Sequence, residues 1–146
     1  MLHLHIETDP LFTAPNKDQC FSILEIIFQD HNIQNGEVSI IFAQDELLAN
    51  LKKEFFKVDQ LTDVIAFRLN EYSEPNIEGE LYISLPRAEE NAKTYKEPFE
   101  REVARLIIHG SLHLLNYDDQ TDEESEQMRQ MEETYLQKTH WKGLLS

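Results

Sequence analysis

The sequence predicts an α+β fold, with a mixed sheet of about four strands covered by about five helices. Four segments show either alternating apolar and polar residues or the β-branched apolar content that is typical of strands. Five segments carry apolar residues at helical spacing, and three of these follow one another in the C-terminal half. That grouping favours α+β over a regularly alternating α/β fold. The chain has 146 residues and no linker rich in Gly, Ser or Pro, so one domain over residues 1–146 is expected.

The first half of the chain predicts two strands and two helices. Residues 2–7 alternate between apolar and polar side chains, which predicts a half-buried strand with two histidines on its polar face. Lys17–His31 has helical spacing, and Asn35-Gly36 predicts a turn after it. Val38–Phe42 is β-branched and apolar, which predicts a strand. Asp45–Phe56 returns to helical spacing.

Two further strands are predicted in the second half. They cover Asp63–Leu69 and Glu80–Leu85, and a loop over Glu71–Gly79 connects them. The order of the four strands in the sheet does not follow from these patterns.

Three helices are predicted after the last strand. Pro86 is expected to open the first, because the first helical position needs no amide donor. The second covers Phe99–Leu115 and has the strongest helical pattern in the chain. The third covers Thr121–Thr139 and begins with a capping box formed by Thr121 and Glu124.

The charge of the chain limits how it can bind nucleic acid. The net charge is −15, which argues against binding by bulk attraction, since phosphate contacts need Lys and Arg. The charges are unevenly spread, with eight acids against one base over Asp118–Glu133 and nine of the thirteen bases over Lys52–Arg105. Two interpretations stay open: a basic face beside an acidic helix, and two ordinary solvated surfaces.

The composition predicts a soluble, cytoplasmic protein without a membrane partner. Cys20 is the one cysteine, so no internal disulfide can form. The longest apolar runs are far shorter than the roughly 18 residues of a membrane span. The N-terminus lacks the basic start and the apolar stretch of a signal peptide.

One segment carries the residues that point to chemistry. His109 and His113 are four residues apart in the Phe99–Leu115 helix, which puts both imidazoles on one face, about 6 Å apart. Two imidazoles placed in this way can hold one metal ion, as in zinc hydrolases. The alternative is two unrelated histidines, since this spacing also occurs by chance. Gly110 costs the helix about 1 kcal/mol, so it indicates that something approaches the backbone closely at this position.

A catalytic metal site usually has three protein ligands, so the chain must offer a third. Asn116 tolerates the left-handed conformation that ends a helix, and the chain can reverse there. Asp118 and Asp119 follow, and a carboxylate could return to the metal from this position. The alternative is an ordinary acidic approach to the last helix. Zinc peptidases place a Glu directly after the first His, and Gly110 in that position disfavours their chemistry.

The segment resembles the signature of the YbeY family of bacterial metal-dependent endoribonucleases, His-Gly-x-Leu-His-Leu-x-Gly-Tyr-Asp-His. The matching positions are His109, Gly110, Leu112, His113, Leu114, Tyr117 and Asp118. Two strand motifs of the family are also similar, in the segments Thr62-Asp63-Val64-Ile65-Ala66-Phe67 and Gly79-Glu80-Leu81-Tyr82-Ile83-Ser84. Glu102 stands where the family carries a Glu. Spacing and order agree over residues 35–135.

Three positions depart from the family pattern. Asp119 stands in the place of the family's third metal-ligating His, and Asn116 stands in the place of a Gly. The left-handed end of the helix can absorb the second change. Where family members often carry an Arg, this chain has Phe56 with Lys57 beside it, and Arg and Lys are not equivalent at a phosphate.

The resemblance implies a single-strand-specific endoribonuclease in ribosomal RNA maturation, notably at the 3′ end of the small-subunit RNA, and in ribosome quality control. It implies one Zn²⁺, or another divalent ion, held by His109, His113 and Asp119. A carboxylate in place of an imidazole lowers the net positive charge at the metal, so a bound water should be less acidic than in the three-histidine site.

Three further residues are expected to take part in catalysis. Lys57 and Arg68 are expected to contact phosphates, and the alternative for both is plain surface charge. Asp118 is expected to orient a metal ligand, and its alternative is a helix-terminal carboxylate without such a role. The expected partners are ribosomal RNA and a ribosome or ribosome-associated protein, but not DNA.

Two other classes of function stay open. One is a metal-dependent hydrolase of another substrate, such as a nucleotide or a peptide. The other is a ribosome-binding protein in which the metal site is structural or degenerate. Cleavage assays on RNA and on the other substrates discriminate between these classes.

Overall fold

A four-stranded mixed sheet organises the protein, as the sequence predicts. The computed structural model describes residues 1–145. The strands are β1 (Leu2–Thr8), β2 (Gly36–Ala43), β3 (Val64–Arg68) and β4 (Ile77–Ser84), in the spatial order β1-β2-β4-β3. β1 pairs in parallel with β2, and β2 with β4, whereas β3 is antiparallel to β4. β3 therefore forms one edge of the sheet.

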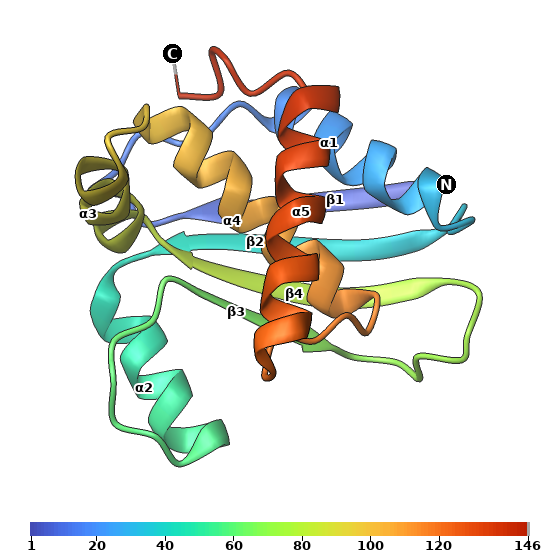
Figure 1. Cartoon of the computed structure of the whole chain (residues 1–146), viewed down its shortest axis with the longest axis horizontal. Helices are drawn as coiled ribbons and strands as arrows, with labels where there is room; N and C mark the ends of the chain where they lie inside the picture. Colours follow the sequence, from blue (N-terminus) through green and yellow to red (C-terminus); the bar gives the residue numbers. More distant parts are fainter. Residues whose placement is uncertain (146) are drawn as a thin grey trace.

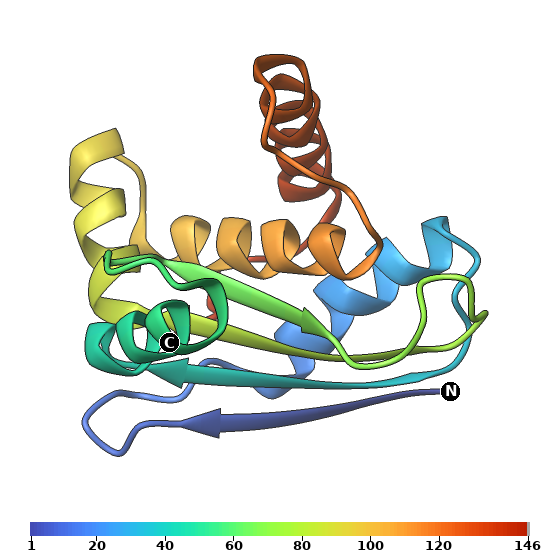
Figure 2. The same cartoon turned by 90° about the horizontal axis from the view of Figure 1, so that it is seen from below.

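Five helices surround this sheet, again as predicted. They are α1 (Lys17–Asp30), α2 (Asp45–Phe56), α3 (Leu85–Tyr95), α4 (Phe99–Leu114) and α5 (Asp122–Lys138). α1 and α4 lie on one face of the sheet, and α5 packs against α4 on the side away from the sheet (Figures 1 and 2). α2 lies near the β3 edge (Figure 1). No helix in the described part of the chain is both long enough and apolar enough to cross a membrane.

The two faces of the sheet have cores of different size. The larger core joins α1, α4 and α5 to the inward-facing side chains of β1, β2 and β4. The smaller core lies under α2, where Leu48 packs with Ala43 and Ile65. α4 is buried on nearly all sides, because it lies between the sheet and α5. Side chains on α4 are therefore held in place by packing from both layers.

Two strands, β2 and β4, begin earlier than the sequence predicts, and the added residues of each include a glycine. Gly36 belongs to β2 rather than to a turn, and it pairs with Ile77 of β4 so closely that a Cβ would collide with the side chain and carbonyl of Ile77. The turn after α1 instead uses Asn32, which has a φ of 61°. Gly79 lies inside β4 rather than in a loop, and a Cβ there would lie 2.8 Å from Leu114 of α4.

Side-chain caps form the starts of α3 and α5, near the residues that the sequence analysis identified as helix starts. The side chain of Ser84 accepts a hydrogen bond from the amide of Arg87 at the start of α3, so Pro86 is the second helical residue rather than the first. At the start of α5, Thr121 and Glu124 form the predicted capping box. This second cap fixes the direction in which α5 leaves the loop that follows α4.

Candidate metal centre

α4 brings His109 and His113 together on one face, as their spacing predicts. The two Nε2 atoms are 3.0 Å apart, and the ring centroids are 4.6 Å apart at an angle of 73°. Both side chains are partly buried, with 16% and 28% of their surface exposed. The two nitrogen atoms therefore converge on one point at the edge of the helix.

A turn after α4 sends the chain back toward the histidines. Asn116 adopts the left-handed conformation, with a φ of 75°. Its amide donates to the carbonyl of His113 at 3.0 Å, and the amide of Tyr117 donates to the carbonyl of Leu112 at 3.0 Å. This pair of bonds is the Schellman arrangement that ends many helices. The prediction that Asn116 can end the helix in this way is confirmed.

The turn places Asp119 beside both histidines. Its Oδ2 atom is 3.4 Å from Nε2 of His109, and its Oδ1 atom is 3.7 Å from Nε2 of His113. One ligand atom from each of the three residues lies within 4.8 Å of the other two. Asp118 is exposed, and its Oδ1 atom accepts a hydrogen bond from the amide of Asp119 at 2.8 Å.

The chemistry of this donor set suits a divalent metal ion. Two imidazoles and one carboxylate form a known catalytic zinc set, and the same set also binds Fe²⁺ and Mn²⁺. An imidazole binds metal only through an unprotonated nitrogen. Burial, and then the neighbouring His109, lower the pKa of His113 below its usual 6.5, although Asp119 opposes the shift. His113 is therefore neutral and available as a ligand at pH 7.

The structure adds a residue that the sequence did not indicate, Glu132 on α5. Its Oε2 atom lies 2.6 Å from Nδ1 of His109, the ring nitrogen that faces away from the cluster. Its Oε1 atom accepts a hydrogen bond from Nη1 of Arg105 at 3.2 Å. Burial alone would raise the pKa of Glu132, but the contacts with His109 and Arg105 overcome it and lower the pKa. Glu132 is therefore a buried carboxylate anion beside the metal ligands.

Arg105 connects Glu132 to a larger buried network. Its Nε and Nη2 atoms each donate to Glu102 at 2.8 Å, in the paired geometry that a guanidinium favours. Asn91 of α3 donates from its Nδ2 atom to both Glu102 and Asp63, each at 2.9 Å. Glu102, noted in the sequence only as a family position, is 2% exposed. Every buried charge in this network therefore has a partner.

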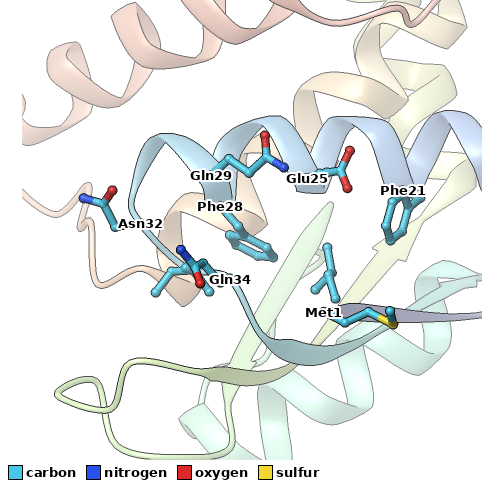
Figure 3. Close-up of a pocket in the computed structure, with 9 residues that line it drawn as sticks. Met1, Phe21, Glu25, Phe28, Gln29, Asn32 and Gln34 are labelled. Carbon is cyan, nitrogen blue, oxygen red and sulfur yellow. The ribbon is translucent and has the colours of Figure 1, made fainter.

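Two residues of the candidate metal group, His109 and Asp119, line a cleft between α4 and α5. This cleft has a volume of about 480 Å³, and its lining includes His109, Asp119, Arg105 and Glu132. A second pocket of about 520 Å³ lies between α1 and the start of β1 (Figure 3). It is lined mainly by Phe21, Phe28 and polar residues of α1, and it contains none of the predicted site residues. The residues that could hold a metal ion therefore lie at the cleft rather than at this larger pocket.

The two predicted phosphate-binding residues lie in other surroundings. Lys57 is exposed, follows α2 in the left-handed conformation, and donates from Nζ to the carbonyl of Glu54 at 3.1 Å. Arg68, at the end of β3, is half-buried, and Nη1 donates to the carbonyl of Leu114 at 2.8 Å. Its Nη2 atom donates to the carbonyls of Glu71 and Asn76.

Comparison with known proteins places these features in a family. A family model described as "Endoribonuclease YbeY" matches residues 7–140. A protein named Endoribonuclease YbeY from Amoebophilus asiaticus is 39% identical over 128 residues, which cover 88% of this chain and 86% of the relative. Another of that name, from Flavobacterium psychrophilum, is 38% identical over 142 residues, which cover 97% and 99% of the two chains.

A solved structure is similar in fold as well. The solution structure of TM1509 from Thermotoga maritima superimposes with a TM-score of 0.60 at 26% sequence identity. The superposition covers 94% of this chain and 87% of that protein.

Proposed function

The chain belongs to the YbeY family of endoribonucleases, and from this premise we propose that it is a metal-dependent hydrolase that cleaves single-stranded RNA. The observation that carries the proposal is the convergence of His109, His113 and Asp119 within 4.8 Å of one another. His109 and Asp119 line a cleft between α4 and α5, where a flexible RNA strand would reach the group.

The three ligands would hold one Zn²⁺. An ion bound there would lower the pKa of a water molecule and polarise a phosphoryl oxygen, which are the two contributions that phosphodiester hydrolysis needs. The protein's own part is to fix the geometry. Asp118 accepts the amide hydrogen of Asp119 and so orients the loop that carries the carboxylate ligand. The buried helix α4 holds the two imidazoles.

We assign the contacts with RNA phosphates to Lys57 and Arg68. Lys57 is exposed, and its ammonium group donates one hydrogen bond to the carbonyl of Glu54, so two of its three donors remain for a phosphate. Arg68 is half-buried and already donates to protein carbonyls, so a phosphate contact would add to bonds that also fix the β3–β4 connection. Both residues belong to the segment that holds nine of the thirteen basic residues of the chain.

The biological substrate that we propose is ribosomal RNA. The role would be maturation of the 3′ end of the small-subunit RNA and quality control of ribosomes, in the cytoplasm. A net charge of −15 weakens unaided capture of RNA, because the two polyanions repel each other. Delivery by a ribosome or a ribosome-associated protein overcomes this repulsion.

Cleavage of matched substrates tests the proposal. The zinc-loaded protein is incubated with a labelled single-stranded RNA, the same RNA in a duplex, and a single-stranded DNA of the same sequence. We expect cleavage of the single-stranded RNA alone. His113→Ala should lose this cleavage, and His140→Ala, which changes an exposed histidine outside the cluster, should keep it.

Other outcomes would identify the other two classes. Hydrolysis of a nucleotide or a peptide without cleavage of RNA would indicate a metal hydrolase of another substrate. Tight zinc binding and co-sedimentation with ribosomes, again without cleavage of RNA, would indicate a ribosome-binding protein with a structural metal site. Either result contradicts the proposed nuclease.

A further inference from the structure

We propose that Glu132 positions the metal ligand His109 by accepting its Nδ1 hydrogen, so that the unprotonated Nε2 atom faces the metal. This inference rests on the metal site proposed above. It assigns a role to a residue of α5 that lies thirteen positions after Asp119 in the sequence.

The two ring nitrogen atoms of His109 have different partners. Nδ1 of His109 lies 2.6 Å from Oε2 of Glu132, while Nε2 lies 3.0 Å from His113 and 3.4 Å from Asp119. The two nitrogen atoms of one ring thus face two different partners. A carboxylate anion can only accept a hydrogen bond, so Nδ1 must carry the hydrogen. In the neutral ring this leaves the lone pair on Nε2, which is the atom at the metal group.

The carboxylate of Glu132 is buried. Only 6% of the Glu132 side chain is exposed. A buried carboxylate is costly unless it has partners, and the partners of Glu132 are His109 and Arg105. The bond joins α5 to α4, and these two helices pack against each other. The bond is therefore maintained by the packing of two helices.

Two carboxylates, those of Glu102 and Glu132, hold the guanidinium of Arg105. Its guanidinium makes two 2.8 Å bonds to Glu102 and one 3.2 Å bond to Glu132. Glu102 is itself fixed by Asn91. Arg105 thus donates to Oε1 of Glu132 from a fixed direction, and the other oxygen, Oε2, faces His109.

His109 and His113 differ in their hydrogen-bond partners. Nε2 of His113 lies 3.0 Å from Nε2 of His109, and among the described residues no carboxylate makes a hydrogen bond with the ring of His113. An anionic acceptor raises the basicity of an imidazole more than a neutral carbonyl does. Glu132 therefore gives His109 an anionic hydrogen-bond partner that His113 lacks, and through this bond the metal affinity depends in part on α5.

Metal affinity measured on two variants of Glu132 tests this role without any RNA. Zinc affinity is measured by competition with a chelating dye. Glu132→Ala should weaken zinc binding about 10–100-fold. Glu132→Gln should weaken it less, because the amide oxygen can accept the same hydrogen bond without the charge. The matched control is Glu133→Gln, an exposed neighbour on α5 that pairs with Arg101 and should change the affinity by less than about twofold.

A spectroscopic measurement separates positioning from general stability. In zinc-loaded protein labelled with ¹⁵N-histidine, His109 should show a hydrogen on Nδ1 and a metal-bound Nε2. Glu132→Ala should shift the Nδ1 signal of His109 and leave that of His113 near its original position. If Glu132→Ala fails to fold, Glu132→Gln provides the same two measurements on a side chain of the same size.

The outcomes that contradict the inference are distinct from those that contradict the metal site. If zinc affinity and the His109 signals in a folded Glu132 variant match those of the unchanged protein, while His109→Ala loses zinc, Glu132 does not position the ligand. If His109→Ala also keeps its zinc, the metal site itself is wrong.

Discussion

Nη1 of Arg68 donates a hydrogen bond to the carbonyl of Leu114 at 2.8 Å, so a residue of the edge strand β3 closes the last turn of α4, the helix that carries His109 and His113. Leu114 follows His113 directly, and its carbonyl is one of those that a helix end leaves without an intrahelical partner. The cation at this end of the helix also interacts favourably with the helix dipole. Arg68 is therefore a structural support of the site, whatever its contact with RNA.

RNA binding by Lys57 and Arg68 can be separated from this support. If both contact phosphates, Lys57→Ala and Arg68→Ala should each weaken binding of single-stranded RNA and reduce its salt slope by about one unit. Arg68→Ala should also lower Tm, because carbonyls at the end of α4 and in the β3–β4 connection lose their donor. Fluorescence titration at several salt concentrations and thermal unfolding give the two readings.

Lys96 supplies the control for Lys57. Both lysines end a helix in the left-handed conformation, with φ values of 56° and 59°, so the backbone effect of an alanine is the same at each. Lys96→Ala should leave the salt slope unchanged. An unchanged affinity and slope in both Lys57→Ala and Arg68→Ala would remove the phosphate contacts.

Removal of either imidazole should remove the metal. His109→Ala and His113→Ala should each lose bound zinc and lose the thermal stabilisation that zinc gives, since a ligand that binds the folded state stabilises it. Elemental analysis and thermal unfolding with and without zinc measure these effects. His3→Ala, which changes an exposed histidine on β1, should keep both. Full metal stoichiometry in both site variants would place the metal elsewhere.

Asp119 should contribute to metal affinity much more than Asp118. Asp119→Ala removes a side chain 3.4 Å from His109, whereas Asp118→Ala removes only a hydrogen bond to the amide of Asp119. Asp119→His should keep the metal and favour Zn²⁺ over Mn²⁺, because imidazole is a softer ligand than carboxylate. Competition with a chelator measures each affinity. Equal affinity in Asp119→Ala and the unchanged protein would leave a site with two protein ligands.

Gly110→Ala should destabilise the fold although alanine favours helices. A Cβ at Gly110 would lie 2.8 Å from Cδ2 of Leu81 and 3.3 Å from Cγ2 of Val64. Overpacking of this kind costs about 1–3 kcal/mol, against a gain of about 1 kcal/mol in helix propensity. Denaturant unfolding measures the difference. The loss should shrink in a Leu81→Val background, and an equal loss in both backgrounds would contradict the steric explanation.

Cys20 should stay unreactive until the protein unfolds. Burial in the core raises the pKa of its thiol from the usual 9.0 to about 12. The thiolate is the reactive form, so a thiol reagent at pH 8.5 should label the folded chain extremely slowly. The unfolded chain ionises near pH 9, so stability is retained below that pH and falls as the pH rises above it. Rapid labelling without denaturant would show that the core around α1 opens readily.

The sequence predicted the local parts of the fold and site well. The two histidines were recognisable because helical spacing alone brings them together, and Asn116 because its residue type suits the left-handed turn. The close approach that Gly110 indicated is the packing of β3 and β4 against α4. Strand order was not predictable, because it depends on how the elements pair across the chain.

The parts that the sequence did not predict depend on contacts between distant elements. Glu132 is one of eight acids over Asp118–Glu133, and only the angle at which α5 crosses α4 selects it as the partner of His109. The bonds of Arg68 to backbone carbonyls leave no mark in the sequence, because a carbonyl is present at every residue. The start of β4 was predicted too late, since Gly79 was interpreted as part of a loop.

The order of elements along the chain has a consequence for protein synthesis. A growing chain emerges from the ribosome N-terminus first. β4 lies between β2 and β3 in the sheet but is synthesised after both of them. Asp119 and Glu132 emerge after all four strands. A partly synthesised chain thus lacks both the third ligand and the partner of His109. The proposed hydrolytic site is therefore completed only after all four strands of the sheet have been synthesised.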